Sequence, residues 1–168
     1  DIYKFTEFQF KVLKDNSRST LDQLRSEYIE TVVMPMITKK SYALVNKHKK
    51  LNDHLLIITA TSSYITKPIG LLFGINDLIG TDPEEVNGEF TGKVRGIPSF
   101  REGKITRLEI WLSEKGLKMN DFDKTFFYSD SKNDIPLLEK VSNPVAVNAD
   151  EELMDFARKR KWPSMNLR

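Results

Sequence analysis

The sequence predicts an α/β fold in which helices cover both faces of a parallel sheet. From residue 37 onward, strand-like apolar runs alternate with amphipathic helical segments. Two of these runs, 55–58 and 126–128, are apolar or aromatic at every position, which is typical of strands buried on both faces. A polar segment follows each of the two runs, and open α/β sheets bind ligands at the carboxyl ends of their strands.

Residues 1–36 predict a helical hairpin, distinct from the α/β core expected over 37–168. Ser19, with Asp22 three residues later, resembles a capping pair, and Pro35 should end or kink the second helix. We expect the aromatic residues Phe5, Phe8 and Phe10 to be core. The positions at helical spacing are Ile2, Phe5, Phe8 and Val12, followed by Leu21, Leu24, Tyr28 and Val32.

The elements after residue 36 can be placed one by one. The Asn87-Gly88 pair between strand-like residues predicts a two-residue β-hairpin. Gly74 and Gly116 each predict the end of a helix. The expected helices are 37–50, one through 69–73, 101–115, 135–140 and 150–161, and the expected strands are 55–58, 78–81, 85–95 as the hairpin, 125–128 and 144–147.

The composition excludes several classes of protein. The 168 residues contain no cysteine and two histidines, which excludes disulfides and thiolate metal sites and disfavours zinc. No run approaches the ~20 apolar residues of a membrane helix. Net charge is +2, and the basic clusters at 39–40, 47–50 and 158–161 lie near expected helix ends, where cations suit the helix dipole. We therefore expect a cytoplasmic protein with no membrane or nucleic-acid partner, and rank a nucleic-acid binder last.

Two carboxylates mark the end of the strand-like run at 126–128. Asp130 follows this strand, and Asp134 stands where Ile135-Pro136 begins a helix. Acids at a strand end beside a helix N-terminus suggest a hard cation such as Mg²⁺, lying between the protein and a phosphate. The alternative is that Asp130 is a turn residue and Asp134 only a helix cap.

Residues of other segments would complete a phosphate site if the strands lie side by side. Thr59 and Thr61 follow the strand at 55–58, and Lys104 lies in the first turns of a helix. A hydroxyl and backbone N–H groups bind phosphate oxygens, and a lysine neutralises phosphate charge. The alternative for Thr59 is a turn residue at the end of a strand. The alternative for Lys104 is a solvated surface lysine, and Arg101 and Glu102 could be surface charges on the same helix.

These segments resemble the motifs of the haloacid dehalogenase superfamily of phosphatases. The run 130–134 (Asp-Ser-Lys-Asn-Asp) is similar to the fourth motif, 55–59 to the second, and Lys104 to the lysine of the third. The finer pattern at 57–61, 100–104 and 128–131 resembles the phosphoserine phosphatase-like branch, whose helical cap the hairpin at 1–36 resembles in part. The resemblance implies a Rossmann-like sheet with a partial cap and a small β-hairpin.

The resemblance also implies an activity and a role for each matched residue. It implies Mg²⁺-dependent hydrolysis of a small phosphorylated metabolite through an aspartyl-phosphate. Asp130 would bind the metal, Asp134 would support it directly or through water, and Asn133 would orient the site. The phosphoryl group would be held by Thr59, Ala60, Thr61 and Lys104.

One motif of the superfamily has no match in the 168 residues. The first motif, Asp-x-Asp after a central strand, carries the nucleophile and should precede the cap. We therefore expect that the natural protein is longer, that this chain alone is inactive, and that it self-associates if the central strand is absent. The alternative function is a protein of the same fold that binds a phosphorylated ligand without turnover.

Overall fold

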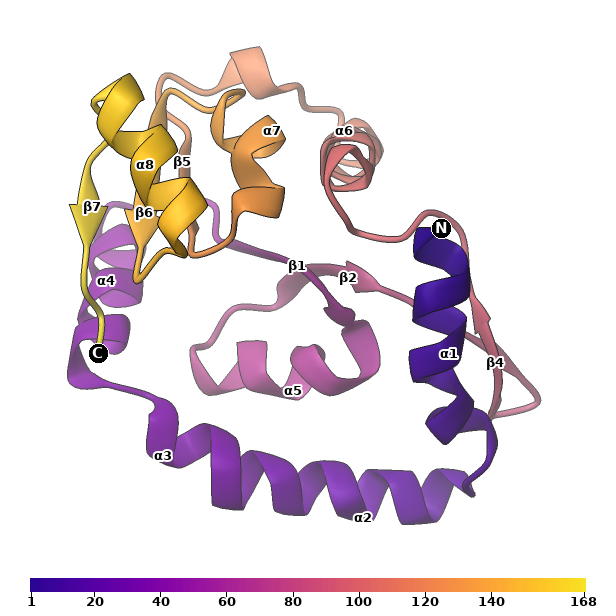
Figure 1. The fold of residues 1–168 in the computed structure, drawn as a ribbon. Helices are drawn as coiled ribbons and strands as arrows, with labels where there is room; N and C mark the ends of the chain where they lie inside the picture. Colours follow the sequence, from indigo (N-terminus) through magenta and orange to yellow (C-terminus); the bar gives the residue numbers. More distant parts are fainter. The chain divides into compact units, whose positions relative to one another are not determined.

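The computed structural model describes residues 1–168 and consists of two compact units, Asp1–Ser99 and Phe100–Arg168 (Figure 1). Each unit carries its own parallel strand pairing, and the backbone ladders form three sheets. The boundary expected at residues 36 and 37 lies inside the first unit and stays a prediction. No helix is both long and apolar enough to span a membrane. The cytoplasmic setting stays a prediction.

The unit Asp1–Ser99 begins with helices and ends with a β-hairpin. β1 and β2 pair in parallel, and β3 and β4 pair antiparallel. The elements are α1 (Ile2–Lys14), α2 (Arg18–Tyr28), a π-helical turn (Ile29–Val33), α3 (Met34–Met36), α4 (Lys39–Lys50), β1 (Leu56–Ser62), α5 (Ser63–Leu72), β2 (Asp77–Thr81), β3 (Pro83–Val86) and β4 (Glu89–Val94).

Polar side chains cap the first helices. Asp1 accepts a hydrogen bond from the Tyr3 amide at 2.9 Å, and Ser17 accepts one from the Thr20 amide at 3.3 Å. The cap of α2 is therefore Ser17, and the expectation of Ser19 was wrong by two residues, because the break at 16–18 is shorter than its polar composition indicates. Pro35 lies within α3, directly after the π-helical turn, and the helix ends at Met36, one residue later, as expected near a proline.

The core of this unit is built on a face of α1 that contains Phe10 but not the other two aromatic residues expected to be core. Phe10, Leu13 and Leu21 are buried with Tyr64 and Phe90, and α1 packs along β4 (Figure 1). The predicted core residues Phe5 and Phe8 are instead 58% and 78% exposed. Leu24 and Tyr28 of α2 and Val32 of the π-helical turn are also exposed. Thr6, Phe10 and Leu13 form a second stripe at helical spacing, and this stripe is the buried one.

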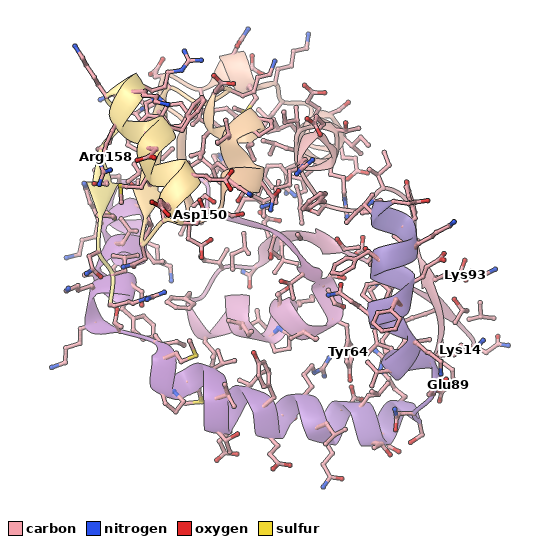
Figure 2. All side chains as sticks on the ribbon, viewed as in Figure 1. Lys14, Tyr64, Glu89, Lys93, Asp150 and Arg158 are labelled. Atoms are coloured by element: carbon pink, nitrogen blue, oxygen red, sulfur yellow. The ribbon has the colours of Figure 1, made fainter.

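Tyr64 lies at the centre of a charged cluster on this core (Figure 2). Its hydroxyl donates a 2.6 Å hydrogen bond to Asp22, and the guanidinium carbons of Arg18 and Arg25 lie 4.9 and 4.1 Å from its ring centroid. We call Arg18, Asp22, Arg25 and Tyr64 the Tyr64 cluster. Burial, followed by the bond to Asp22, raises the pKa of Tyr64 to about 12. The same hydrogen bond is the largest cause of the lowered pKa of Asp22.

The β-hairpin was predicted correctly, and one strand was predicted too short. Asn87 and Gly88 connect β3 to β4 with positive φ at both positions, as a two-residue type I′ turn requires. β1 continues through residues 59–62, which were expected to form a loop, and α5 begins directly after it. The pairing with β2 shifts between Ile58 and Ser62, so the hydroxyl-rich segment is an irregular end of the strand.

The unit Phe100–Arg168 is a parallel sheet with helices. The strand order is β5-β6-β7, and Leu138, Ala146, Leu153 and Ala157 form its buried core. The elements are α6 (Glu102–Glu114), a 3₁₀ turn (Met119–Asp121), β5 (Phe126–Ser129), a 3₁₀ turn (Lys132–Asp134), α7 (Ile135–Leu138), β6 (Asn143–Val147), α8 (Glu151–Arg160) and β7 (Ser164–Met165). The short strand β7 was not predicted. The expected α/β fold with parallel strands and a β-hairpin is confirmed.

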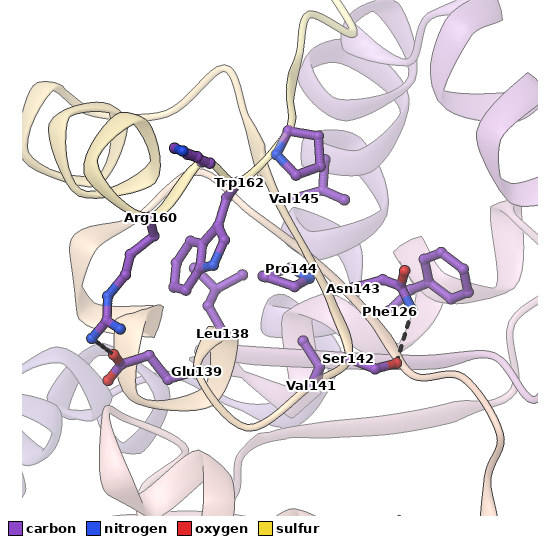
Figure 3. A pocket seen from close by; sticks show the side chains of 12 residues that line it. Phe126, Leu138, Glu139, Val141, Ser142, Asn143, Pro144, Val145, Arg160 and Trp162 are labelled. Atoms are coloured by element: carbon purple, nitrogen blue, oxygen red, sulfur yellow. Dashed lines mark hydrogen bonds and ion pairs between the residues drawn. The ribbon is translucent and has the colours of Figure 1, made fainter.

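A hollow of about 470 Å³ opens at the amino ends of β5 and β6 (Figure 3). Phe126 and Asn143, the first residues of these strands, line it together with Trp162 and the ion pair between Arg160 and Glu139. Ser129 and Asp130 lie at the other end of β5. The hollow is therefore separate from the strand ends where the sequence predicts ligand binding.

Candidate active site

Lys104 is a buried lysine in the first turn of α6. Lys104 is 5% exposed. Its ammonium nitrogen lies 2.5 Å from Asp134 Oδ1 and 5.9 Å from the ring centroid of Phe127. The alternative of a solvated surface lysine is therefore wrong. Burying a charge is costly unless it is paired and hydrogen-bonded, so this position is unusual for a residue with only a structural role.

Asp134 accepts hydrogen bonds through both of its carboxylate oxygens. Oδ1 receives Lys104, and Oδ2 accepts a 2.6 Å bond from the hydroxyl of Ser129, the last residue of β5. The backbone of Asp134 occupies the cap position of α7, but its side chain makes no capping bond. The alternative of a mere helix cap is therefore wrong, and the carboxylate is committed to the lysine. We call Lys104 and Asp134 the buried pair.

Asp130 and Asn133 lie on the same loop, between β5 and α7. The Asp130 side chain is exposed and makes no hydrogen bond or ion pair, while its backbone carbonyl accepts the Asp150 amide at 2.8 Å. Asn133 Oδ1 accepts a 3.1 Å bond from Arg101 Nε. Asp150, the cap of α8 that is labelled in Figure 2, also accepts the Lys132 amide at 2.8 Å, which fixes the loop. A free carboxylate therefore stands on a well-anchored loop at the carboxyl end of β5.

Thr59, Ala60 and Thr61 occupy the irregular end of β1 in the other unit. Thr59 Oγ1 accepts the Thr61 amide at 3.1 Å, and the Ala60 carbonyl accepts the Thr81 hydroxyl at 2.8 Å. Gly80 permits this arrangement, because a Cβ at residue 80 would lie 2.9 Å from the backbone of Ser63. These hydroxyl and amide groups have the chemistry for binding phosphate, and Ala60 and Thr61 are exposed.

The structure thus brings together Lys104, Asn133 and Asp134, with Asp130 on the same loop. The role of each residue stays a prediction. Reasoning from the sequence missed Ser129 and Arg101. A hydroxyl directly before Asp130 was the available signal for Ser129, whereas no pattern indicates that Arg101 reaches Asn133.

The basic clusters make contacts within their own units. Lys49 Nζ donates to the Phe73 carbonyl at 2.5 Å, Arg158 pairs with Asp155 at 3.0 Å, and Arg160 pairs with Glu139 at 2.5 Å. The sequence favoured solvated helix ends over a nucleic-acid patch, and the absence of a nucleic-acid partner stays a prediction.

Comparison with known proteins identifies the class of enzyme. Residues 3–139 match the family described as haloacid dehalogenase-like hydrolase. A histidinol-phosphatase of Neisseria meningitidis is 42% identical over all of this chain and 76% of its own length. The phosphoserine phosphatase SerB1 of Mycobacterium tuberculosis is 29% identical over 93% of this chain, which spans 50% of that relative.

A solved structure shows the same fold. A protein of unknown function from Bordetella pertussis Tohama I has a TM-score of 0.96 and 39% identity, over 99% of this chain and 74% of its own. The chain belongs to the haloacid dehalogenase-like hydrolase family. The resemblance in its motifs and the expected Rossmann-like fold are therefore confirmed, as is the class of hydrolase.

Proposed function

We propose that the protein hydrolyses a small phosphomonoester with the help of Mg²⁺. The observation that carries the proposal is the buried pair at the carboxyl end of β5, in a chain of this hydrolase family. The relatives named histidinol-phosphatase and phosphoserine phosphatase support it. Both names denote phosphate esters of small molecules that carry an amino group, and we propose this class for the substrate.

The proposed reaction has two steps. An aspartate carboxylate forms a bond to phosphorus while the bond from phosphorus to the ester oxygen breaks, and the released alkoxide takes a proton. Water then cleaves the aspartyl-phosphate, which releases inorganic phosphate and restores the carboxylate. The proposal assigns the nucleophile to an aspartate outside residues 1–168, because the two site aspartates of this chain have other roles.

The residues of this chain would bind the phosphoryl group and hold the site in position. Lys104 would neutralise phosphate charge. Asp134 accepts a hydrogen bond from its ammonium group, and Ser129 in turn donates one to Asp134. The resemblance also assigns Thr59 and Thr61 to phosphate binding, and this role stays a prediction. Asn133 would orient the loop that carries Asp130.

The residues present fit a magnesium ion. Mg²⁺ is usually held by one or two carboxylates together with water and substrate phosphate oxygens. Asp130 offers a carboxylate free of other partners. Asp134, whose two oxygens are bonded to Lys104 and Ser129, would support the metal through water. When bound, the metal would supply positive charge to the phosphoryl oxygens.

An assay of the natural protein tests the proposal. We expect release of phosphate from histidinol phosphate or phosphoserine, loss of this activity after treatment with a chelator, and recovery with Mg²⁺. Asp130→Asn should lower kcat/KM about 10²-fold, whereas Asp123→Asn, at an exposed aspartate, should not change it.

Two outcomes would contradict the proposal. A protein that binds phosphate but releases none from any phosphomonoester would be the non-catalytic alternative. Full activity without a divalent cation would show that the assignment of the two carboxylates to a metal is wrong.

A further inference from the structure

Arg101 has a backbone conformation that is normally reserved for glycine. Its φ and ψ are 48° and −121°, and the Gly103 amide donates to the Phe100 carbonyl at 2.9 Å. These angles match the first central position of a type II′ turn, where a residue with a Cβ is strained. Strain of this kind persists where the surrounding structure enforces it and is frequent at functional sites.

The Arg101 side chain is held at one end and free at the other. Nε donates to Asn133 Oδ1 at 3.1 Å, and the guanidinium carbon lies 5.2 Å from the Phe100 ring centroid. The two terminal nitrogens donate no hydrogen bond and form no ion pair, and the residue is exposed. A planar guanidinium with a free edge is suited to binding two oxygens of a phosphate group.

The charge of the site calls for such a cation. The positive charge of Lys104 is balanced by the negative charge of Asp134. Asp130 adds a second negative charge, so these three residues carry a net charge of −1. Lys132, the other cation on the loop, pairs with Glu152. A phosphomonoester carries up to two negative charges. A bound divalent cation would bring these residues to one positive charge, and the proposed nucleophilic aspartate would cancel it. Arg101 would supply a positive charge that the site otherwise lacks.

We propose that Arg101 contacts the substrate, with its free guanidinium edge binding non-bridging oxygens of the phosphoryl group. This inference rests on the proposed function and adds a residue to that site. The strained turn holds the guanidinium beside Asn133, one residue before Asp134.

Replacing Arg101 by glycine separates the strain from the side chain. In the natural protein, Arg101→Gly should raise the urea midpoint of unfolding, because glycine accepts the turn without strain. The same variant should weaken binding of inorganic phosphate, titrated calorimetrically with Mg²⁺ present, at least tenfold. It should lower kcat/KM by a similar factor. Arg101→Lys keeps the charge but loses the planar edge. Its phosphate affinity and kcat/KM should lie between those of the wild type and Arg101→Gly. Arg158→Ala, at an exposed arginine of the same unit, should match the wild type.

Three results decide the inference. Unchanged phosphate affinity and kcat/KM in Arg101→Gly would overturn it. The inference would also be overturned if Asn133→Ala caused the same loss and the double variant Arg101→Gly/Asn133→Ala lost no more. Arg101 would then only position Asn133. If the wild type binds phosphate without turnover, the proposed hydrolysis fails, and the phosphate titration still decides the role of Arg101.

Discussion

Each unit of the molecule contains a cluster of opposite charges, and the two clusters differ in their access to water. In the Tyr64 cluster, the side chains of Arg18 and Asp22 are 31% and 46% exposed. In the buried pair, the side chains of Lys104 and Asp134 are 7% and 8% exposed. Exposed ion pairs contribute little to stability, whereas buried ones carry a desolvation cost that their attraction often fails to offset.

The comparison indicates different reasons for the two clusters. The Tyr64 cluster covers an aromatic core, with Arg18 also 4.4 Å from the Phe90 ring centroid, so its contribution comes largely from packing. The buried pair places a cation and an anion in a setting where apolar residues are often as stable or more stable. Its position beside the free carboxylate of Asp130 is therefore better explained by function than by stability.

The largest effect on stability is expected from breaking the buried pair on one side. Lys104→Met leaves the Asp134 carboxylate buried and unpaired, which should lower the free energy of unfolding by about 3 kcal/mol. Adding Asp134→Asn should recover most of this loss, since the unpaired charge disappears and Ser129 keeps an acceptor. Urea denaturation of both variants measures the difference. A double variant no more stable than the single one would contradict this account of the pair.

A packing change in the other unit should have the next largest effect. Gly80→Ala places a Cβ 2.9 Å from the backbone of Ser63, and should cost about 2 kcal/mol through overpacking. At Gly88 no atom lies within 4 Å of an added Cβ, but φ is +83°, so Gly88→Ala should cost only about 1 kcal/mol. Thermal or urea unfolding would compare the two. Equal losses would mean that the close approach at Gly80 is relieved by local movement.

Removing one hydroxyl from the Tyr64 cluster should have a smaller effect. Tyr64→Phe keeps the ring under Arg18 and Arg25 but removes the hydrogen bond to Asp22, which should cost about 1.5 kcal/mol. Because the ring packing remains, kcat/KM should be unchanged. If Tyr64→Phe lost much of its activity without losing stability, the Tyr64 cluster would have a functional role and the structural explanation would be wrong.

The smallest effect expected is a pH dependence of the Tyr64 cluster. Since the pKa of Asp22 is lowered on folding, its contribution is present above the ordinary value of 3.8 and is lost as pH falls through the folded pKa. Since the pKa of Tyr64 rises from 10.0 to about 12, its contribution is complete below pH 10 and is lost as pH rises toward 12. Urea midpoints of the wild type and Tyr64→Phe should therefore converge at both extremes. A constant difference across the range would contradict these shifts.

The sequence predicted the class of fold well because the signals are local. Strand-like apolar runs, helix-ending glycines and the Asn87-Gly88 turn each act over a few residues. The choice of buried face on α1 could not be predicted, since Phe5 and Phe8 are as apolar as Phe10 and only tertiary packing distinguishes them. The short pairing of Ser164 and Met165 with β6 also has no local signal.

The site was predictable in its residue types but not in its contacts. Spacing and resemblance predicted Lys104, Asp130 and Asp134 as site residues. The burial of Lys104 could not be predicted, because it depends on how α6 packs against β5 and α7. The conformation of Arg101 was not predictable, because it is one that an arginine rarely adopts. Lys104 and Arg101, which both lie at the proposed site, depart from local rules in burial and in backbone conformation.

The most direct test of the site is the activity of Lys104→Met in the natural protein. With Mg²⁺ and a phosphomonoester substrate, kcat should fall about 10³-fold. Lys140→Met, at an exposed lysine of the same unit, should keep wild-type activity. The double variant Lys104→Met/Asp134→Asn should regain stability and remain inactive, which would separate catalysis from folding. If Lys104→Met or the stable double variant turns over substrate like the wild type, the buried pair is structural and the phosphoryl site lies elsewhere.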